Sequence, residues 1–126
     1  MTNLPISIPV YSSRGDAEAF LAYPYLFNRM GEWVGWVTPD REVYSVLGQY
    51  VGELTTEPRI LRKRVQDPPK PDRKPPPPPP GKIHPPATVR LAPLMGEMAF
   101  SLIDVLLDEP ERLHTLDAGE GRQDMD

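Results

Sequence analysis

The sequence predicts a mainly β fold: a small closed or nearly closed barrel of about four repeated β-hairpins, with a polyproline arm and one short C-terminal helix. Three observations predict it: a glycine-centred repeat in the first half, a proline-dense middle and an apolar pattern at helical spacing near the end. With 18 prolines among 126 residues, much of the chain is barred from helices and central strands. We expect four segments, namely a hairpin barrel over residues 1–65, a proline-rich extended arm over 66–93, a short amphipathic helix docked on the barrel over 94–114 and a disordered acidic tail over 115–126.

The repeat is the first element of this prediction. Gly15, Gly31 and Gly48 follow one another at intervals of 16 and 17 residues, each after an aliphatic–aromatic pair and before a short apolar run. Two β-prone runs separated by a few polar residues and a glycine are typical of a tight hairpin, in which glycine takes the positive φ of the turn. Each unit is therefore interpreted as one hairpin.

A second small residue recurs four positions after each turn glycine, at Ala19, Gly35 and Gly52. A missing side chain inside a strand is typical of a β-bulge or of a close approach by other backbone. Strand alternation puts these small residues on one almost wholly apolar face and puts Val34 and Val51 on the opposite face.

A fourth unit begins at residues 59–62 but lacks its glycine and its returning strand, because the chain then runs into proline. An unpaired strand leaves an exposed edge, which soluble proteins avoid. We hypothesise that Leu4, Ile6 and Ile8 supply the absent strand and close the ring.

These repeats resemble the four-fold β-flower family, in which aromatic-x-x-x-glycine hairpins precede a proline-rich stretch and a short terminal helix. The resemblance covers residues 4–107 in outline, and the three repeats are its specific part. It implies a shallow, pseudo-symmetric barrel with no assigned enzymatic activity, and the likeness of such barrels to tubby-like lipid-binding barrels implies an apolar ligand or a membrane surface by analogy of fold. Ala19 stands where glycine is usual and the fourth unit is incomplete, so a small barrel of the PRC type is the alternative.

The proline-dense stretch predicts a stiff arm. Residues 68–86 contain 11 prolines, six of them consecutive from Pro75 to Pro80. Such runs adopt a left-handed extended helix without internal hydrogen bonds. Arg73, Pro76 and Pro79 fit the basic-x-x-Pro-x-x-Pro pattern of ligands for aromatic grooves such as those of SH3 domains. The alternative is a rigid spacer, because a run of six prolines meets that pattern by chance.

The last predicted element is a helix of about 12 residues. Ala99, Leu102, Ile103 and Leu106 recur at helical spacing, and prolines bound this stretch on both sides. A helix of that length is marginal alone in water, so we expect it to dock on the barrel.

For function, the sequence predicts a binding protein rather than an enzyme. It contains no phosphate loop, no nucleophile elbow, no metal-ligand spacing and no cysteine, so no catalytic residue, metal or cofactor is expected. One hypothesis is a site for an apolar small molecule or lipid on the barrel face, and plain core packing is the alternative for the residues that would line it. These residues are Tyr11, Phe27, Tyr44, Trp33, Trp36 and Tyr50.

The second hypothesis is a protein-interaction adaptor, in which the arm or the helix docks on another chain. A basic stretch over residues 59–74 lies between acidic regions and no recognised nucleic-acid motif is present, which argues against a nucleic-acid partner. The sequence has neither an apolar run long enough for a membrane span nor a signal-peptide pattern, and we expect a cytoplasmic protein. The ligand, the partner and the oligomeric state are left open.

Overall fold

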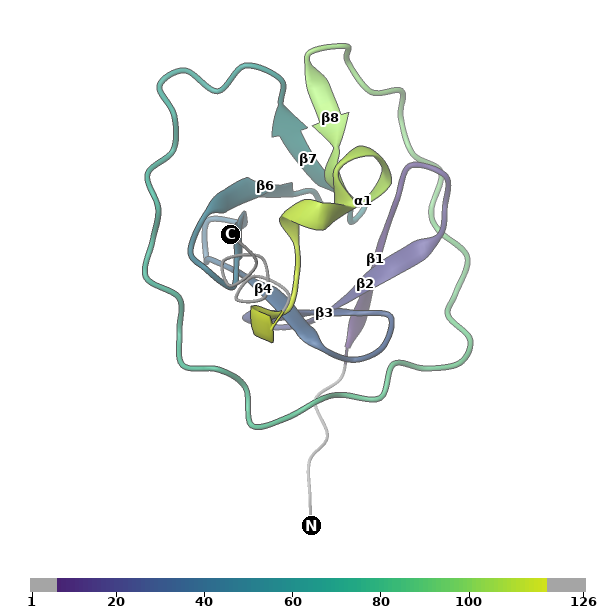
Figure 1. Cartoon of the computed structure of the whole chain (residues 1–126). Helices are drawn as coiled ribbons and strands as arrows, with labels where there is room; N and C mark the ends of the chain where they lie inside the picture. The colour runs from purple at the N-terminus through teal and green to yellow at the C-terminus, as the bar shows by residue number, and fades with distance from the viewer. Residues whose placement is uncertain (1–6, 118–126) are drawn as a thin grey trace.

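The fold is a single antiparallel β-sheet of eight strands that curls into an open half-barrel (Figure 1). The structure, a computed structural model, describes residues 7–117, so the predicted tail beyond residue 117 lies outside the described residues. Each strand pairs with its neighbour in the chain, in the order β1 to β8. The strands are β1 (Ile8–Tyr11), β2 (Ala17–Ala22), β3 (Tyr25–Asn28), β4 (Trp33–Val37), β5 (Glu42–Ser45), β6 (Tyr50–Leu54), β7 (Ile60–Lys63) and β8 (Leu102–Asp104).

The sheet does not close, although the sequence predicted a closed or nearly closed barrel. Within residues 7–117 no strand ladder joins β1 to β8. The backbone N–H of Tyr11, at the end of β1, donates instead to the carbonyl of Pro58 in the β6–β7 loop, 3.0 Å away. A side chain links the two edge strands. The carboxylate of Asp104, in β8, accepts a 2.6 Å hydrogen bond from the backbone N–H of Ser13, in the turn after β1.

The three turns that contain glycine share one hydrogen-bonding pattern, which the turn from Thr38 to Glu42 also follows, with Arg41 at φ +68° in the place of glycine. In the β1–β2 turn the N–H of Gly15 donates to the carbonyl of Ser12, and the N–H of Ser12 donates to the carbonyl of Asp16. The turns that begin at Asn28 and Ser45 repeat both bonds, with donor–acceptor distances of 2.8–3.0 Å. The turn glycines have φ angles of +91°, +81° and +88°, a region that residues with a Cβ rarely adopt.

A β-bulge follows each of the three glycine turns and decides which residues face inward. The strand register shifts between Val10 and Tyr11, between Leu26 and Phe27, and between Val43 and Tyr44. On the opposing strands the extra residues are Glu18, Val34 and Val51. Val34 and Val51 belong to the buried core cluster, so their predicted placement on the opposite face is wrong. The bulge adds one residue and reverses the alternation on which that prediction relied.

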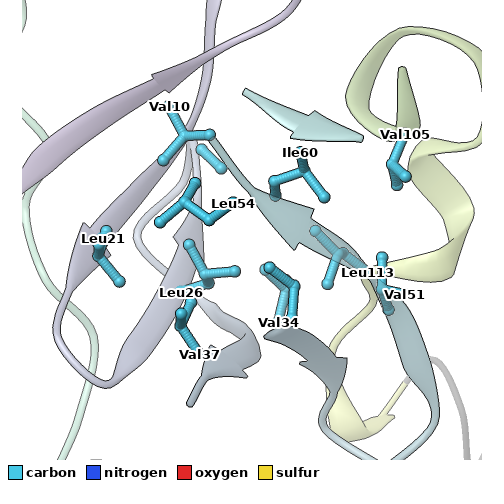
Figure 2. Close-up of a cluster of buried hydrophobic side chains, with 12 residues drawn as sticks. Val10, Leu21, Leu26, Val34, Val37, Val51, Leu54, Ile60, Val105 and Leu113 are labelled. Atoms are coloured by element: carbon cyan, nitrogen blue, oxygen red, sulfur yellow. The ribbon is translucent and has the colours of Figure 1, made fainter. Parts of the chain in front are cut away.

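The inner face of the sheet is aliphatic and carries the core (Figure 2). Alternation then turns the aromatic residue that follows each inward aliphatic residue, for example Tyr11 after Val10, to the outer face. The core cluster also includes two residues from beyond β8. Its members are Val10, Ala19, Leu21, Leu26, Val34, Val37, Val43, Val51, Leu54, Ile60, Val105 and Leu113.

The partner of β7 is β8 rather than the N-terminal segment. Leu61 pairs with Asp104 and Lys63 with Leu102. Ile8 lies in β1 and pairs with Leu21 of β2, so it does not supply the absent strand. Leu4 and Ile6, the other two residues of that hypothesis, lie outside the described residues.

The predicted C-terminal helix is much shorter than expected. Residues 102–104 form β8, and the helix that follows, α1 (Val105–Asp108), is one turn long, with a 3-10 turn at Pro110–Arg112. Asp104 caps α1, because its side chain accepts a hydrogen bond from the N–H of Leu107. β7 pairs with residues 102–104, although the spacing of the apolar side chains in this stretch is also compatible with a helix. None of the helices found within residues 7–117 is long and apolar enough to cross a membrane.

We predict that Gly31→Ala destabilises the fold more than Gly15→Ala. Both glycines have positive φ, so both substitutions carry a strain of roughly 1–2 kcal/mol. A Cβ at Gly31 would also collide with the carbonyl of Ile83, whereas at Gly15 the nearest atom, the Cβ of Ala92, would lie 3.7 Å away. Urea unfolding should give a loss at least about 1 kcal/mol larger for Gly31→Ala. Equal losses for the two variants would contradict the close approach at Gly31.

Candidate functional site

The six aromatic residues singled out as a ligand site lie mainly on the outer side of the sheet. Tyr11, Phe27 and Tyr44 are each only 2% exposed, and none of them belongs to the inner aliphatic cluster. Trp36 stacks on Tyr44 with ring centroids 5.0 Å apart, and Tyr50 meets Tyr44 edge-on at 5.7 Å. Trp33 is half-buried on β4. The structure therefore brings most of the predicted set into one outer aromatic layer, which another part of the chain covers.

That cover is the segment between β7 and β8, residues 64–101, which we call the connection. It contains no helix or strand and runs around the outside of the half-barrel before returning as β8 (Figure 1). It crosses the three turns in reverse order. The N–H of Arg73 donates to the carbonyl of Gly48 (2.9 Å), the N–H of Ile83 donates to that of Gly31 (3.0 Å), and Ala92 lies beside Gly15.

Gly31 and Gly48 are needed for this contact as well as for their turns. A Cβ on either residue would collide with a carbonyl oxygen of the connection, from Ile83 at Gly31 and from Arg73 at Gly48. Gly35 and Gly52 meet the sheet's own strands instead. A Cβ at Gly35 would lie 2.6 Å from the carbonyl oxygen of Tyr44, and one at Gly52 would lie 2.7 Å from that of Leu61.

Ion pairs hold the start of the connection against β5. The ammonium of Lys70 lies 2.7 Å from one carboxylate oxygen of Glu42, and a guanidinium nitrogen of Arg73 lies 3.6 Å from the other. The hydrogen bond from Lys70 is the largest cause that lowers the pKa of the Glu42 carboxyl. Burial, with the nearby carboxylate of Glu53, raises the pKa of the Tyr50 hydroxyl to about 12, so Tyr50 stays neutral at physiological pH.

The three residues of the predicted SH3-type pattern lie along this part of the connection. The side chain of Arg73 is 49% exposed, pairs with Glu42 and lies 5.8 Å from the centre of the Tyr44 ring. Pro76 and Pro79 are half-buried. A partner that read this pattern would therefore compete with contacts that Arg73 makes to its own barrel.

The interior of the half-barrel is filled by the C-terminal segment. Val105 of α1 is fully buried and Leu113 is 9% exposed, and both point into the aliphatic core (Figure 2). Leu113 packs so closely on β4 that a Cβ at Gly35 would lie 2.8 Å from its methyl group. The small cavity that remains beside Val34 and Leu113 has a volume of about 130 Å³, below the range of 300–1,000 Å³ typical of small-molecule sites.

The most exposed apolar residues lie in the second half of the connection, in the arm and helix segments of the adaptor hypothesis, where the sequence analysis singled out no individual residue. Leu91 and Phe100 expose 92% and 85% of their surface, and Leu94 is fully exposed. The backbone around them is held: the carbonyl of Arg90 accepts a 2.8 Å hydrogen bond from the hydroxyl of Tyr11, and the carbonyl of Gly96 accepts a 3.4 Å bond from Arg59. A signal for this surface was present, because these large apolar residues follow the proline stretch without strand alternation.

Comparison of the chain with protein-family models, with curated proteins and with solved structures finds no match. The function must therefore be argued from the geometry of the chain itself. Among residues 7–117 no three His, Asp or Glu side chains gather where they could hold a metal ion.

We predict that Glu42→Gln destabilises the protein at neutral pH but not in strong acid. Because the pKa of Glu42 is lowered in the folded state, its ion pairs stabilise the fold above the ordinary carboxyl value of 4.5. That stabilisation is lost as the pH falls through the lowered folded pKa. Urea unfolding at pH 7 and pH 3 should show a difference between wild type and variant that shrinks at the lower pH.

The matched control for this experiment is Glu18→Gln. Glu18 pairs with Arg29 at 3.7 Å, and the Arg29 side chain is 71% exposed, so the substitution should change stability little at either pH. If Glu18→Gln lowered the free energy of unfolding as much as Glu42→Gln does, the ion pairs of Glu42 with Lys70 and Arg73 would not explain the loss.

We also predict that Leu113→Ala costs about 2–4 kcal/mol, because it leaves a cavity where the C-terminal segment fills the half-barrel. Leu91→Ala, at an exposed position, should change the free energy of unfolding by less than about 0.5 kcal/mol. Chemical denaturation of both variants measures the two changes in the free energy of unfolding. A neutral Leu113→Ala would mean that the C-terminal segment does not fill the interior in solution.

Proposed function

We propose that this chain is a non-enzymatic protein-binding module that presents the second half of its connection, residues 89–101, to a partner protein. One observation carries the proposal: Leu91, Leu94 and Phe100 expose nearly all of their apolar surface on one short stretch. Contiguous exposed apolar surface is typical of interaction sites, and these three side chains fall within ten residues of the chain.

The backbone of this stretch supports recognition as an extended peptide. It forms no helix or strand, so most of its N–H and C=O groups are not taken up by regular structure. Hydrogen bonds from Tyr11 to Arg90 and between Arg59 and Gly96 tie it to the barrel. A segment that is already held in place loses less conformational entropy when a partner binds, so a modest apolar contact suffices for affinity.

The two places where a small apolar ligand could bind, the interior of the half-barrel and the outer aromatic layer, are already filled or covered. This favours a protein partner. Val105 and Leu113 fill the interior of the half-barrel. The outer aromatic residues Tyr11 and Tyr44 are 2% exposed beneath the connection. A lipid or small molecule at either place would have to displace part of the chain.

We further propose that the chain is related to the four-fold β-flower family and that its architecture derives from four hairpins. The turns at Gly15, Gly31 and Gly48 each combine a glycine at positive φ with a β-bulge, and this shared geometry supports the relationship. The pairing of β7 with β8 supports a fourth hairpin, into which the proline-rich connection has been inserted. Under this proposal the connection replaces the tight turn of the last unit.

We predict that the double substitution Leu91→Ser, Leu94→Ser abolishes partner binding without unfolding the module. Both side chains are almost fully exposed, so removing them should change stability little while removing the apolar contact. Chemical cross-linking of tagged protein in cells, followed by quantitative mass spectrometry, should recover the partner at least about tenfold less efficiently.

Met30→Ser is the matched control, because Met30 is 73% exposed but lies in the β3–β4 turn. It should leave partner recovery unchanged. Equal recovery with the Leu91, Leu94 variant and with wild type would remove residues 89–101 from consideration as the binding surface.

A further inference from the structure

The proline run of the connection lies on an aromatic pair of the barrel. Tyr25 of β3 and Trp33 of β4 meet edge to face, with ring centroids 6.0 Å apart and planes at 87°. Their inward neighbours Leu26 and Val34 belong to the core, so the two rings stand on the outer side of the sheet. Both rings are half-buried.

One hydrogen bond between this pair and the run is of the kind that holds a polyproline ligand in its groove. The hydroxyl of Tyr25 donates a 2.6 Å hydrogen bond to the carbonyl oxygen of Pro77. Trp33, Pro78 and Pro79 line one mainly apolar hollow of about 300 Å³, so the run forms part of its wall beside the indole ring. Domains that recognise proline-rich segments also offer aromatic rings to the run, and Tyr25 and Trp33 provide such rings beside Pro77–Pro79.

We infer that the Tyr25–Trp33 pair is a binding site for proline-rich peptides that the chain's own Pro77–Pro79 segment occupies. The occupant is a proline-rich segment of another protein, which would replace the internal one. This inference does not depend on the proposed partner surface at Leu91 and Leu94, which lies elsewhere on the connection.

The structure explains why the internal segment can leave the site while the rest of the connection stays. The connection is held to the barrel on both sides of the run, by the N–H of Arg73 on Gly48 and by the N–H of Ile83 on Gly31. Prolines have no N–H, so the run contributes no backbone donor between these two points. A segment tethered in this way has an effective concentration in the millimolar range, so it masks the site from weaker external ligands.

The test is a titration of a loosened full-length chain, Pro77→Gly, Pro78→Gly, Pro79→Gly, with a decaproline peptide. The length of the run is unchanged, so the contacts of Arg73 and Ile83 can persist. We expect the loosened chain to bind decaproline at least about tenfold more tightly than wild type, because the internal competitor is removed. The indole N–H resonance of Trp33, assigned by comparison with Trp33→Phe, reports binding at this site.

Two controls make the result specific. A glycine–serine peptide of equal length should not shift the Trp33 resonance. Adding Tyr25→Phe to the loosened chain removes the donor to the peptide carbonyl and should weaken decaproline binding about tenfold. A loosened chain that is folded, by the dispersion of its amide resonances, and binds decaproline no better than the glycine–serine peptide overturns the inference.

If the triple glycine variant does not fold, Pro78→Ala takes its place. Alanine keeps the carbonyl of Pro77 and the length of the chain but removes one ring from the hollow lined by Trp33. This variant should bind decaproline measurably more tightly than wild type, and an affinity equal to that of wild type counts against the site.

Discussion

The approach of the connection to Gly31 and Gly48 is the constraint on which the rest of the structure depends. At both turns a carbonyl oxygen of the connection lies where a Cβ would be, so only glycine allows the contact. The two contacts keep the connection over the outer face of the sheet, where the aromatic residues lie. Without that cover the rings of Tyr11, Phe27 and Tyr44 would face water, and a sheet of short strands would bury apolar surface on one side only.

The two faces of the sheet are covered by successive parts of the same C-terminal half. The connection lies over the outer aromatic layer, and Val105 and Leu113 fill the inner aliphatic side. Asp104 joins the two ends of the sheet, because its carboxylate accepts hydrogen bonds from Ser13 and Leu107 while its backbone pairs with β7. Since a small domain buries only a modest fraction of its surface, the hairpins before residue 64 depend on the C-terminal half of the chain for a complete core.

The sequence predicted the local features of this fold and missed those that depend on distant residues. The positive φ of Gly15, Gly31 and Gly48 followed from their spacing, because a tight turn requires it locally. The inward direction of Val34 and Val51 did not follow, since a bulge reverses the alternation. The extent of the C-terminal helix was missed because β7 needed a partner strand. The aromatic residues were identified as a set, but nothing local indicated that residues 70–92 would cover them.

Proline chemistry explains how a segment that covers a sheet can also present the interaction surface that we propose. A covering segment in ordinary extended conformation would bring buried N–H groups that need partners, whereas a proline-rich one brings mainly carbonyls, which barrel side chains such as Tyr25 can satisfy. The segment therefore needs no ladder with the sheet, and its outward side chains are not constrained by strand alternation. Leu91 and Leu94 can then face solvent while the backbone beside them stays on the barrel. Both proposed binding surfaces thus belong to the cover or to the aromatic pair beneath it, because Val105 and Leu113 fill the interior of the half-barrel.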